Sequence, residues 1–207
     1  VSRDWSSDVC SSDLRELKQS TAKLEELNIL LQQQANEDGL TKLYNRRYMD
    51  TKLEESIAWH GRRNISMTVI LLDVDFFKPY NDNYGHIQGD KCLQGLANTL
   101  KELFVRAGEF VGRYGGEEFV IILSDTDSSV ANLQANRVKE ALHEMNYVHD
   151  YSAVSDRVTA SQGVLSFVPE GGEAIASIYE KVDQALYQAK QSGRNTYIQR
   201  DIMELEQ

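Results

Sequence analysis

Two glycines in the middle of the chain constrain its fold more than any other feature. Gly115 and Gly116 separate a mildly apolar stretch from the strongly apolar run 119–123. Because glycine adopts positive φ without strain, two strand-like runs joined by such a pair predict a tight β-hairpin, with positive φ at both glycines. Glu117 and Glu118 follow the pair. Side chains alternate along a strand, so we expect these two acids to point to opposite faces of the sheet.

Composition limits the class of protein. The chain has 207 residues, with 26% charged and 41% hydrophobic side chains, which is typical of a globular domain with an extension. Its net charge of −10 argues against a nucleic-acid partner, because nonspecific nucleic-acid binders are normally basic. A nucleotide ligand stays possible, since a metal ion and a few local cations can hold phosphates on an acidic protein.

Cysteine usage and hydropathy favour the cytoplasm. Cys10 and Cys92 have no spacing that indicates a disulfide framework or a cysteine-rich metal site. No apolar run approaches the roughly 20 residues that span a bilayer, and no secretory signal is visible. We expect a cytoplasmic protein, or the cytoplasmic part of a membrane-anchored receptor whose anchor lies outside this chain.

The N-terminal part divides into two segments. Residues 1–13 are rich in Ser and Asp without a period, so we expect a disordered end, of the composition that a tag or cloning remnant would have. Residues 14–37 contain no Gly or Pro and predict one helix. Leu24, Leu27 and Leu31 have the spacing of a coiled coil. We call these three residues the leucine seam.

Two interpretations of this helix compete. Ser20 and Gln34 occupy further seam positions and weaken the seam. A single amphipathic helix packed on its own domain would satisfy the pattern. We favour a parallel dimer helix that joins the domain to an upstream sensor domain outside this chain, because the apolar stripe is narrow and the other faces are polar.

Residues 38–200 alternate between strand-like and helical patterns, and 201–207 predict a frayed tail. The β-branched run 65–72 predicts a buried central strand. Asn45 can cap a helix that runs to about His60. We therefore predict an α/β (α+β) fold, with a mostly antiparallel sheet and helices on both faces.

Acidic side chains gather at two points of this pattern. Asp73 and Asp75 end the predicted central strand, and Glu117 and Glu118 follow the glycines. If the strands are neighbours, the four carboxylates converge, and converging carboxylates persist mainly where a cation neutralises them. Oxygen ligands without His or Cys suit Mg²⁺, which also binds substrate phosphates. Taken alone, two acids at a hairpin tip ordinarily belong to a solvated loop.

Groups that suit a nucleotide flank these acids. Backbone N–H groups of the turn 74–77 favour phosphate. The candidate phosphate-binding cations are Lys78, Lys190 and Arg194. Asn81 and Asp90 are candidates for binding a base, and guanine suits an accepting carboxylate because its N1–H and N2–H₂ groups are donors. The residues alone thus indicate a metal–nucleotide site beside the solvated-loop alternative.

Residues 38–197 resemble the GGDEF domain family of diguanylate cyclases. Several separate motifs match in the same order, at 38–48, 73–78, 81–90, 113–119 and 189–195. The resemblance implies a cyclase-like palm fold. It also implies that a homodimer condenses two GTP into cyclic di-GMP and two pyrophosphates, with two Mg²⁺ or Mn²⁺ ions per site.

The resemblance also implies a role for each matching residue. The implied metal ligands are Asp73, the Val74 carbonyl, Glu117 and Glu118. Glu118 would help to deprotonate the attacking 3′-hydroxyl, and Glu117 and Lys78 would also act in catalysis. The implied phosphate groups are the Phe76 and Phe77 amides, Lys78, Lys190 and Arg194. Asn81 and Asp90 would hold guanine. Asp38 would pair with Arg113 and connect the incoming helix to the hairpin.

One departure from the family pattern concerns regulation. The product-inhibition site of the family is Arg-x-x-Asp, and this chain has Arg106 and Glu109 at those positions. Glu is one methylene longer, so we predict weak or absent product inhibition. The alternative function is a non-catalytic sensor of GTP or cyclic di-GMP, whose usual mark is a damaged hairpin or a lost metal ligand. A purely structural dimerisation module is disfavoured by Lys190 and Arg194 beside the acids.

Overall fold

The computed structural model describes residues 5–201, without the side chains of residues 5–14, 16, 26, 28, 30 and 33. The chain divides into two compact units, Val1–Glu37 and Asp38–Gln207. Residues 1–4 and 202–207 lie outside the described part, and so do those portions of the two predicted irregular ends.

The first unit is the helix α1 (Trp5–Asn36). The prediction of a disordered end is wrong for residues 5–13, because the helix already begins at Trp5. Residues 5–36 contain no glycine or proline, so no residue in this stretch interrupts the helix. The leucine seam is exposed, with Leu24 58%, Leu27 46% and Leu31 60% accessible. An exposed apolar stripe supports the predicted dimer helix, which stays a prediction.

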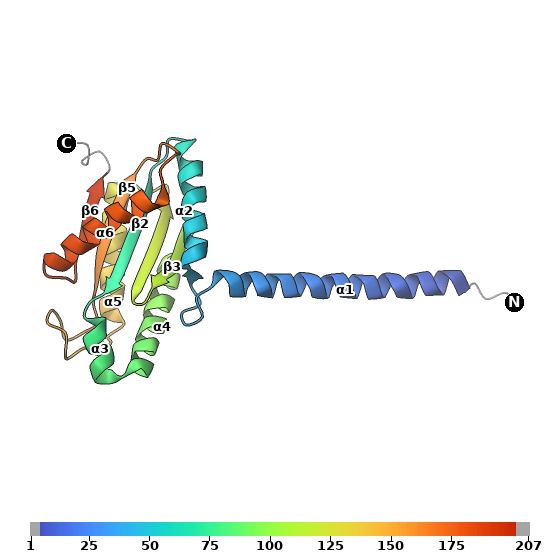
Figure 1. Ribbon diagram of the computed structural model, residues 1–207, viewed down its shortest axis with the longest axis horizontal. Coiled ribbons are helices and arrows are strands. Elements are labelled where there is room, and N and C mark those ends of the chain that lie inside the picture. Colours follow the sequence, from blue (N-terminus) through green and yellow to red (C-terminus); the bar gives the residue numbers. More distant parts are fainter. Residues whose placement is uncertain (1–4, 202–207) are drawn as a thin grey trace. The chain divides into compact units, whose positions relative to one another are not determined.

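The second unit is built on one sheet of six strands (Figure 1). In spatial order these are β1 (Tyr44–Asn45), β3 (Glu109–Gly115), β4 (Glu118–Ser124), β2 (Met67–Val74), β5 (Ala160–Phe167) and β6 (Tyr197–Asp201). The three inner pairings are antiparallel, and β1 and β6 join the edges in parallel. The predicted mostly antiparallel sheet is confirmed.

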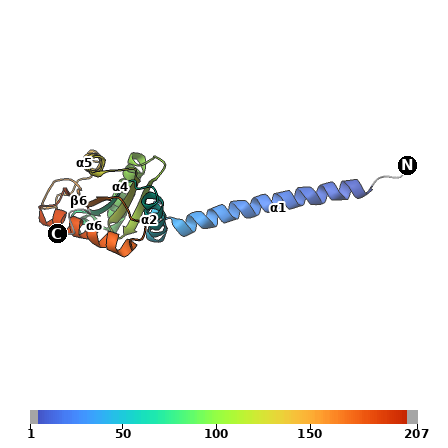
Figure 2. The same cartoon turned by 90° about the horizontal axis from the view of Figure 1, so that it is seen from above.

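Helices cover both faces of this sheet, as Figure 2 shows from above. One face carries α2 (Arg46–Gly61) and α6 (Ile175–Gln191). The other carries α3 (Phe77–Tyr84), α4 (His86–Leu103) and α5 (Ser128–Glu144). Strand β2 is buried on both faces, because Ile70 and Leu72 pack under the second set of helices while Val69 and Leu71 pack under the first. This is the buried central strand that the β-branched run predicted.

The hairpin differs in one respect from the prediction. Gly116 has φ of 53°, but Gly115 is the last residue of β3 and has no positive φ. The pairing register shifts between Arg113 and Gly115, which is a bulge. The expectation of positive φ at both glycines is therefore wrong, because the turn consists of Gly116 and Glu117. Arg113 stabilises it by donating from Nε and Nη2 to the Gly116 carbonyl, at 2.8 and 2.6 Å.

Candidate active site

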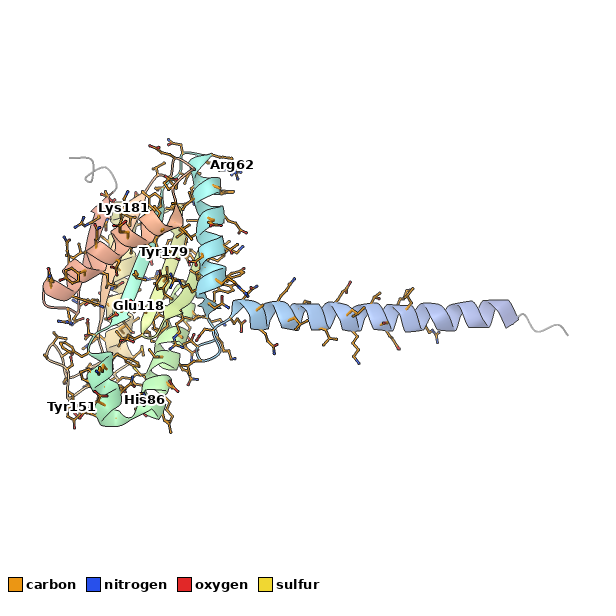
Figure 3. The ribbon with its side chains drawn as sticks, in the orientation of Figure 1. Arg62, His86, Glu118, Tyr151, Tyr179 and Lys181 are labelled. Atoms are coloured by element: carbon orange, nitrogen blue, oxygen red, sulfur yellow. The ribbon has the colours of Figure 1, made fainter. Side chains whose placement is uncertain are left out.

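Two carboxylates face each other across neighbouring strands. Asp73 of β2 lies directly opposite Glu118 of β4. Both are on the sheet face covered by α6, where Lys190 Nζ lies 2.9 Å from Asp73 Oδ2. Glu118 also lines a cavity of about 390 Å³ with Tyr179 of α6 (Figure 3). The antiparallel pairing of β2 and β4 thus brings together acids that are far apart in sequence.

The electrostatics of this pair favour a cation. Burial raises the pKa of Asp73, and the charge of Glu117 raises it further, against the lowering effect of Lys190. Burial also raises the pKa of Glu118, and the Asp73 carboxylate adds to this shift. Both carboxyls therefore resist ionisation in the absence of a further positive charge.

The hairpin turn brings the third acid to the same strand end. Glu117 lies in the turn, and its backbone carbonyl accepts a hydrogen bond from the Val74 amide at 3.3 Å. Among the side chains that the structure describes, no cluster of three or more acidic, His or Cys groups is close enough to hold a metal ion. The donors nevertheless fit a hard divalent cation, because they are oxygens whose charges repel and Lys190 already pairs with one of them.

Asp75 does not belong to this cluster. Its side chain is buried and accepts hydrogen bonds from Thr159 Oγ1 at 2.8 Å, from Ser161 Oγ at 2.7 Å and from the backbone amide of Asn195 at 3.0 Å. The expectation that all four carboxylates converge on one cation is wrong for Asp75, because both of its oxygens already accept hydrogen bonds. Sequence reasoning missed these partners. The available signal is the pair of hydroxyl residues Thr159 and Ser161, two positions apart where β5 begins, because this spacing puts two side chains on the same face of an extended segment.

A turn suited to phosphate follows Asp75. We call residues 75–77 the phosphate turn. Phe76 has φ of 54°, and α3 begins at Phe77, so the first amides of this helix have no partner within it. The guanidinium carbon of Arg194 lies 4.6 Å from the centre of the Phe76 ring. Arg194 Nη1 also donates to the backbone carbonyl of Lys190 at 3.5 Å, which fixes the guanidinium against the end of α6.

The three remaining phosphate and base candidates lie on α3 and α4. Lys78 is exposed in the first turn of α3. Asn81 Oδ1 is buried without a hydrogen-bond partner among the described residues. It packs so closely against Gly89 that a Cβ there would lie 1.8 Å from it. Asp90 is exposed one residue further on α4. A buried acceptor without a donor fits a ligand that supplies one.

Two arginines complete the predicted set. Arg113 Nη1 lies 3.1 Å from Asp38 Oδ1, which is the pair that the resemblance implied. Its regulatory role stays a prediction. Arg106 is exposed, and its backbone amide donates to Glu109 Oε2 at 2.9 Å. The Glu109 carboxylate is therefore folded back into its own turn.

The sheet, its flanking helices and the paired carboxylates define an α/β domain with a candidate metal–nucleotide site. The family model "Diguanylate cyclase, GGDEF domain" matches residues 35–196. The chain belongs to this family. No helix in the described part of the chain is long and apolar enough to cross a membrane.

Curated relatives and solved structures agree with the family. The chain is 36% identical over 163 residues to diguanylate cyclase DgcP of Pseudomonas aeruginosa, covering 79% of this chain and 24% of that protein. It is 36% identical over 171 residues to diguanylate cyclase A of Treponema denticola, covering 81% and 45%. The chain thus spans less than half of the length of these two relatives.

A solved structure extends the likeness to the helix α1. The coiled coil and GGDEF domain of DgcB from Caulobacter crescentus, in complex with c-di-GMP, has a TM-score of 0.78 at 28% identity and covers 92% of this chain and 99% of that one. The active GGEEF domain of a diguanylate cyclase from Vibrio cholerae has a TM-score of 0.65 at 34% identity, covering 76% and 97%. The predicted fold, with its N-terminal helix, is confirmed.

Proposed function

We propose that residues 38–200 are a diguanylate cyclase domain, which condenses two GTP into cyclic di-GMP and two pyrophosphates. The observation that carries the proposal is the Asp73–Glu118 pair with Lys190 at 2.9 Å, beside the phosphate turn. These groups hold negative charge that a metal can neutralise and positive charge that a triphosphate can neutralise. The family and the 36% identity to named cyclases support the same reaction.

The residues divide the work by their chemistry. Asp73, Glu117, Glu118 and the Val74 carbonyl would hold Mg²⁺ or Mn²⁺. Such ions, when bound, lower the pKa of the 3′-hydroxyl and stabilise charge on the leaving pyrophosphate. Glu118, whose pKa is raised by burial, would also accept the hydroxyl proton. Asn81 and Asp90 would hold guanine by accepting its N–H donors.

The phosphate groups of GTP would meet three kinds of donor. The Phe76 and Phe77 amides lie at the start of α3, where the helix dipole favours an anion. Arg194 stacks on Phe76 and donates to the backbone carbonyl of Lys190. Lys78 adds a mobile point charge from the first turn of α3. Positioning of the triphosphate contributes most of what these residues do.

The active unit would be a homodimer. Each domain offers one GTP site, so joining two GTP requires two domains that face each other across a two-fold axis. The exposed leucine seam of α1 would bring them together and transmit the signal of an upstream sensor domain. We place this assembly in the cytoplasm. Product inhibition would be weak, because Glu109 is engaged by the Arg106 amide.

The alternative is a non-catalytic sensor of GTP or cyclic di-GMP. An incubation with GTP and Mg²⁺, with products separated by chromatography, decides between the two. The proposal predicts cyclic di-GMP from the wild type and none from Glu117→Ala. Bound GTP without product at any protein concentration would favour the sensor, and binding of neither GTP nor cyclic di-GMP would overturn both.

A further inference from the structure

The phosphate turn holds a conformation that local sequence does not explain. Phe76 has φ of 54° and ψ of 33°, which is the left-handed region. For a bulky aromatic residue this conformation is an outlier, and it persists only where surrounding contacts determine it. The contacts that determine it come from β5, from the segment after α6 and from the loop before β5.

The Asp75 carboxylate joins the phosphate turn to two of these segments. It is 1% exposed and accepts from Thr159 Oγ1 and Ser161 Oγ near the start of β5. The same carboxylate accepts a hydrogen bond from the backbone amide of Asn195 at 3.0 Å. Asn195 follows Arg194, and both have positive φ, 46° and 63°. One buried side chain therefore fixes both the turn that contains the Phe76 amide and the turn that carries Arg194.

His149 holds the turn from the other side. It is 1% exposed, and its Nε2 lies 3.1 Å from the Phe76 carbonyl oxygen. A carbonyl only accepts, so Nε2 carries the hydrogen. The ring packs edge-on against Tyr80 at 5.1 Å between ring centres. Its Nδ1 is buried without a hydrogen-bond partner among the described residues. Within that part of the chain, the ring therefore forms its hydrogen bond through Nε2, to the Phe76 carbonyl.

We propose that Asp75 and His149 are positioning residues that hold the phosphate turn in its left-handed conformation, so that the Phe76 amide and Arg194 meet the triphosphate together. The inference rests on the proposed function and deepens it. Neither side chain touches the substrate. Loss of either allows Phe76 to relax out of positive φ, which turns its amide away from the phosphates. Asn81, the proposed guanine acceptor, packs against Gly89 of α4. We therefore expect guanine binding to depend much less on the turn than phosphate binding does.

This separation of phosphate from guanine gives the test. The two probes are 3′-deoxy-GTP, which binds without an attacking hydroxyl, and guanosine, which carries no phosphate. His149→Phe keeps the packing on Tyr80 but removes the donor to Phe76. His149→Gln is the matched control, because its amide nitrogen can replace Nε2 as donor. Asp75→Ala removes all three acceptor contacts, whereas Asp75→Asn retains a hydrogen-bonding group for each.

We expect His149→Phe and Asp75→Ala to raise the Kd of 3′-deoxy-GTP about tenfold and that of guanosine less than about twofold. His149→Gln and Asp75→Asn should keep both constants within roughly threefold of the wild type. Thr159→Val, which removes one hydrogen bond without changing shape, should give a smaller rise for 3′-deoxy-GTP alone. Thr159→Val tests the role of the Asp75 contacts if Asp75→Ala does not fold.

Two results would overturn the inference. Equal weakening of both probes would show a structural role only, and unchanged affinity of a folded His149→Phe or Thr159→Val variant would show that the turn does not need these contacts. If the wild type bound guanosine and 3′-deoxy-GTP while these variants did so equally well, the inference would fail alone. If the wild type bound neither, the proposed function would fail with it.

Discussion

The proposed base site depends on the absence of a side chain at Gly89. A Cβ at this position would lie 1.8 Å from Asn81 Oδ1, so Asn81 would have to turn away. Alanine is otherwise favoured in a helix, so the helix itself should tolerate the change. The missing Cβ of Gly89 therefore leaves room for the buried acceptor that we assign to guanine.

We predict that Gly89→Ala raises the Kd of GTP about tenfold and shifts the unfolding midpoint by less than about 2 °C. Titration calorimetry and a thermal melt measure the two quantities. Asn81→Ala should have the same effect, and the double variant should be no worse than either single one. Additive losses would contradict the assignment.

Asp38 is a second residue with a measurable charge effect. Burial opposes its ionisation, but hydrogen bonds from Thr41 and Arg113 together hold its pKa below the ordinary 3.8. The unfolded chain therefore binds the proton more readily than the native domain. The resulting stability is present above pH 3.8 and is lost as the pH falls through the lowered pKa.

We predict that Asp38→Asn lowers the free energy of unfolding by about 1 kcal/mol at pH 7 and that the difference shrinks below about pH 3.8. Urea unfolding at both pH values measures it. Asp156→Asn is the control, because Asp156 is 78% exposed in its pair with Arg157. A difference that grows toward low pH would refute this account.

Single residues also show what the sequence could predict. The Asp73–Glu118 pair followed from two strand-like runs with acids at their ends, because neighbouring antiparallel strands place such residues opposite each other. Asp75 looked the same in sequence but is buried by partners 84, 86 and 120 positions away. No local pattern distinguishes a carboxylate that binds a cation from one that accepts distant hydroxyl and amide donors.

At the scale of elements, the turn between α4 and β3 determines the expected regulation. Arg106 and Glu109 are joined by two hydrogen bonds. The Glu109 amide donates to the Arg106 carbonyl, and the Arg106 amide donates to the Glu109 carboxylate. A carboxylate engaged in its own turn is less available to a ligand. We predict that cyclic di-GMP in excess over GTP leaves the initial rate unchanged. Strong inhibition of the wild type by cyclic di-GMP would contradict this prediction. Glu109→Asp is the variant that we expect to become sensitive to cyclic di-GMP.

The hairpin shows where element prediction reaches its limit. The two strands and the tight turn were predicted from Gly115 and Gly116, and both strands form. The observed turn lies one residue later than the predicted turn, because a bulge after Arg113 places Gly115 in β3. Since the Arg113 side chain holds the Gly116 carbonyl, the turn geometry depends on a side-chain contact that a two-residue glycine rule does not contain.

At the scale of the whole molecule, the activity is expected to depend on α1. The leucine seam is exposed on the single chain, which leaves apolar surface for a second copy. We predict that Leu24→Asp lowers the specific activity several-fold at low protein concentration and much less at high concentration. Thr21→Asp, on a neighbouring exposed position outside the seam, is the control. Equal activity of Leu24→Asp and wild type at every concentration would exclude the role of the seam.

The rate of cyclic di-GMP formation as a function of protein concentration tests the central claim most directly. If two domains must meet to join two GTP, the rate per protein molecule rises with concentration until the dimer is saturated, and Glu117→Ala is inactive throughout. A rate per molecule that is already maximal at the lowest concentration, in a protein shown to be monomeric there, would contradict the account.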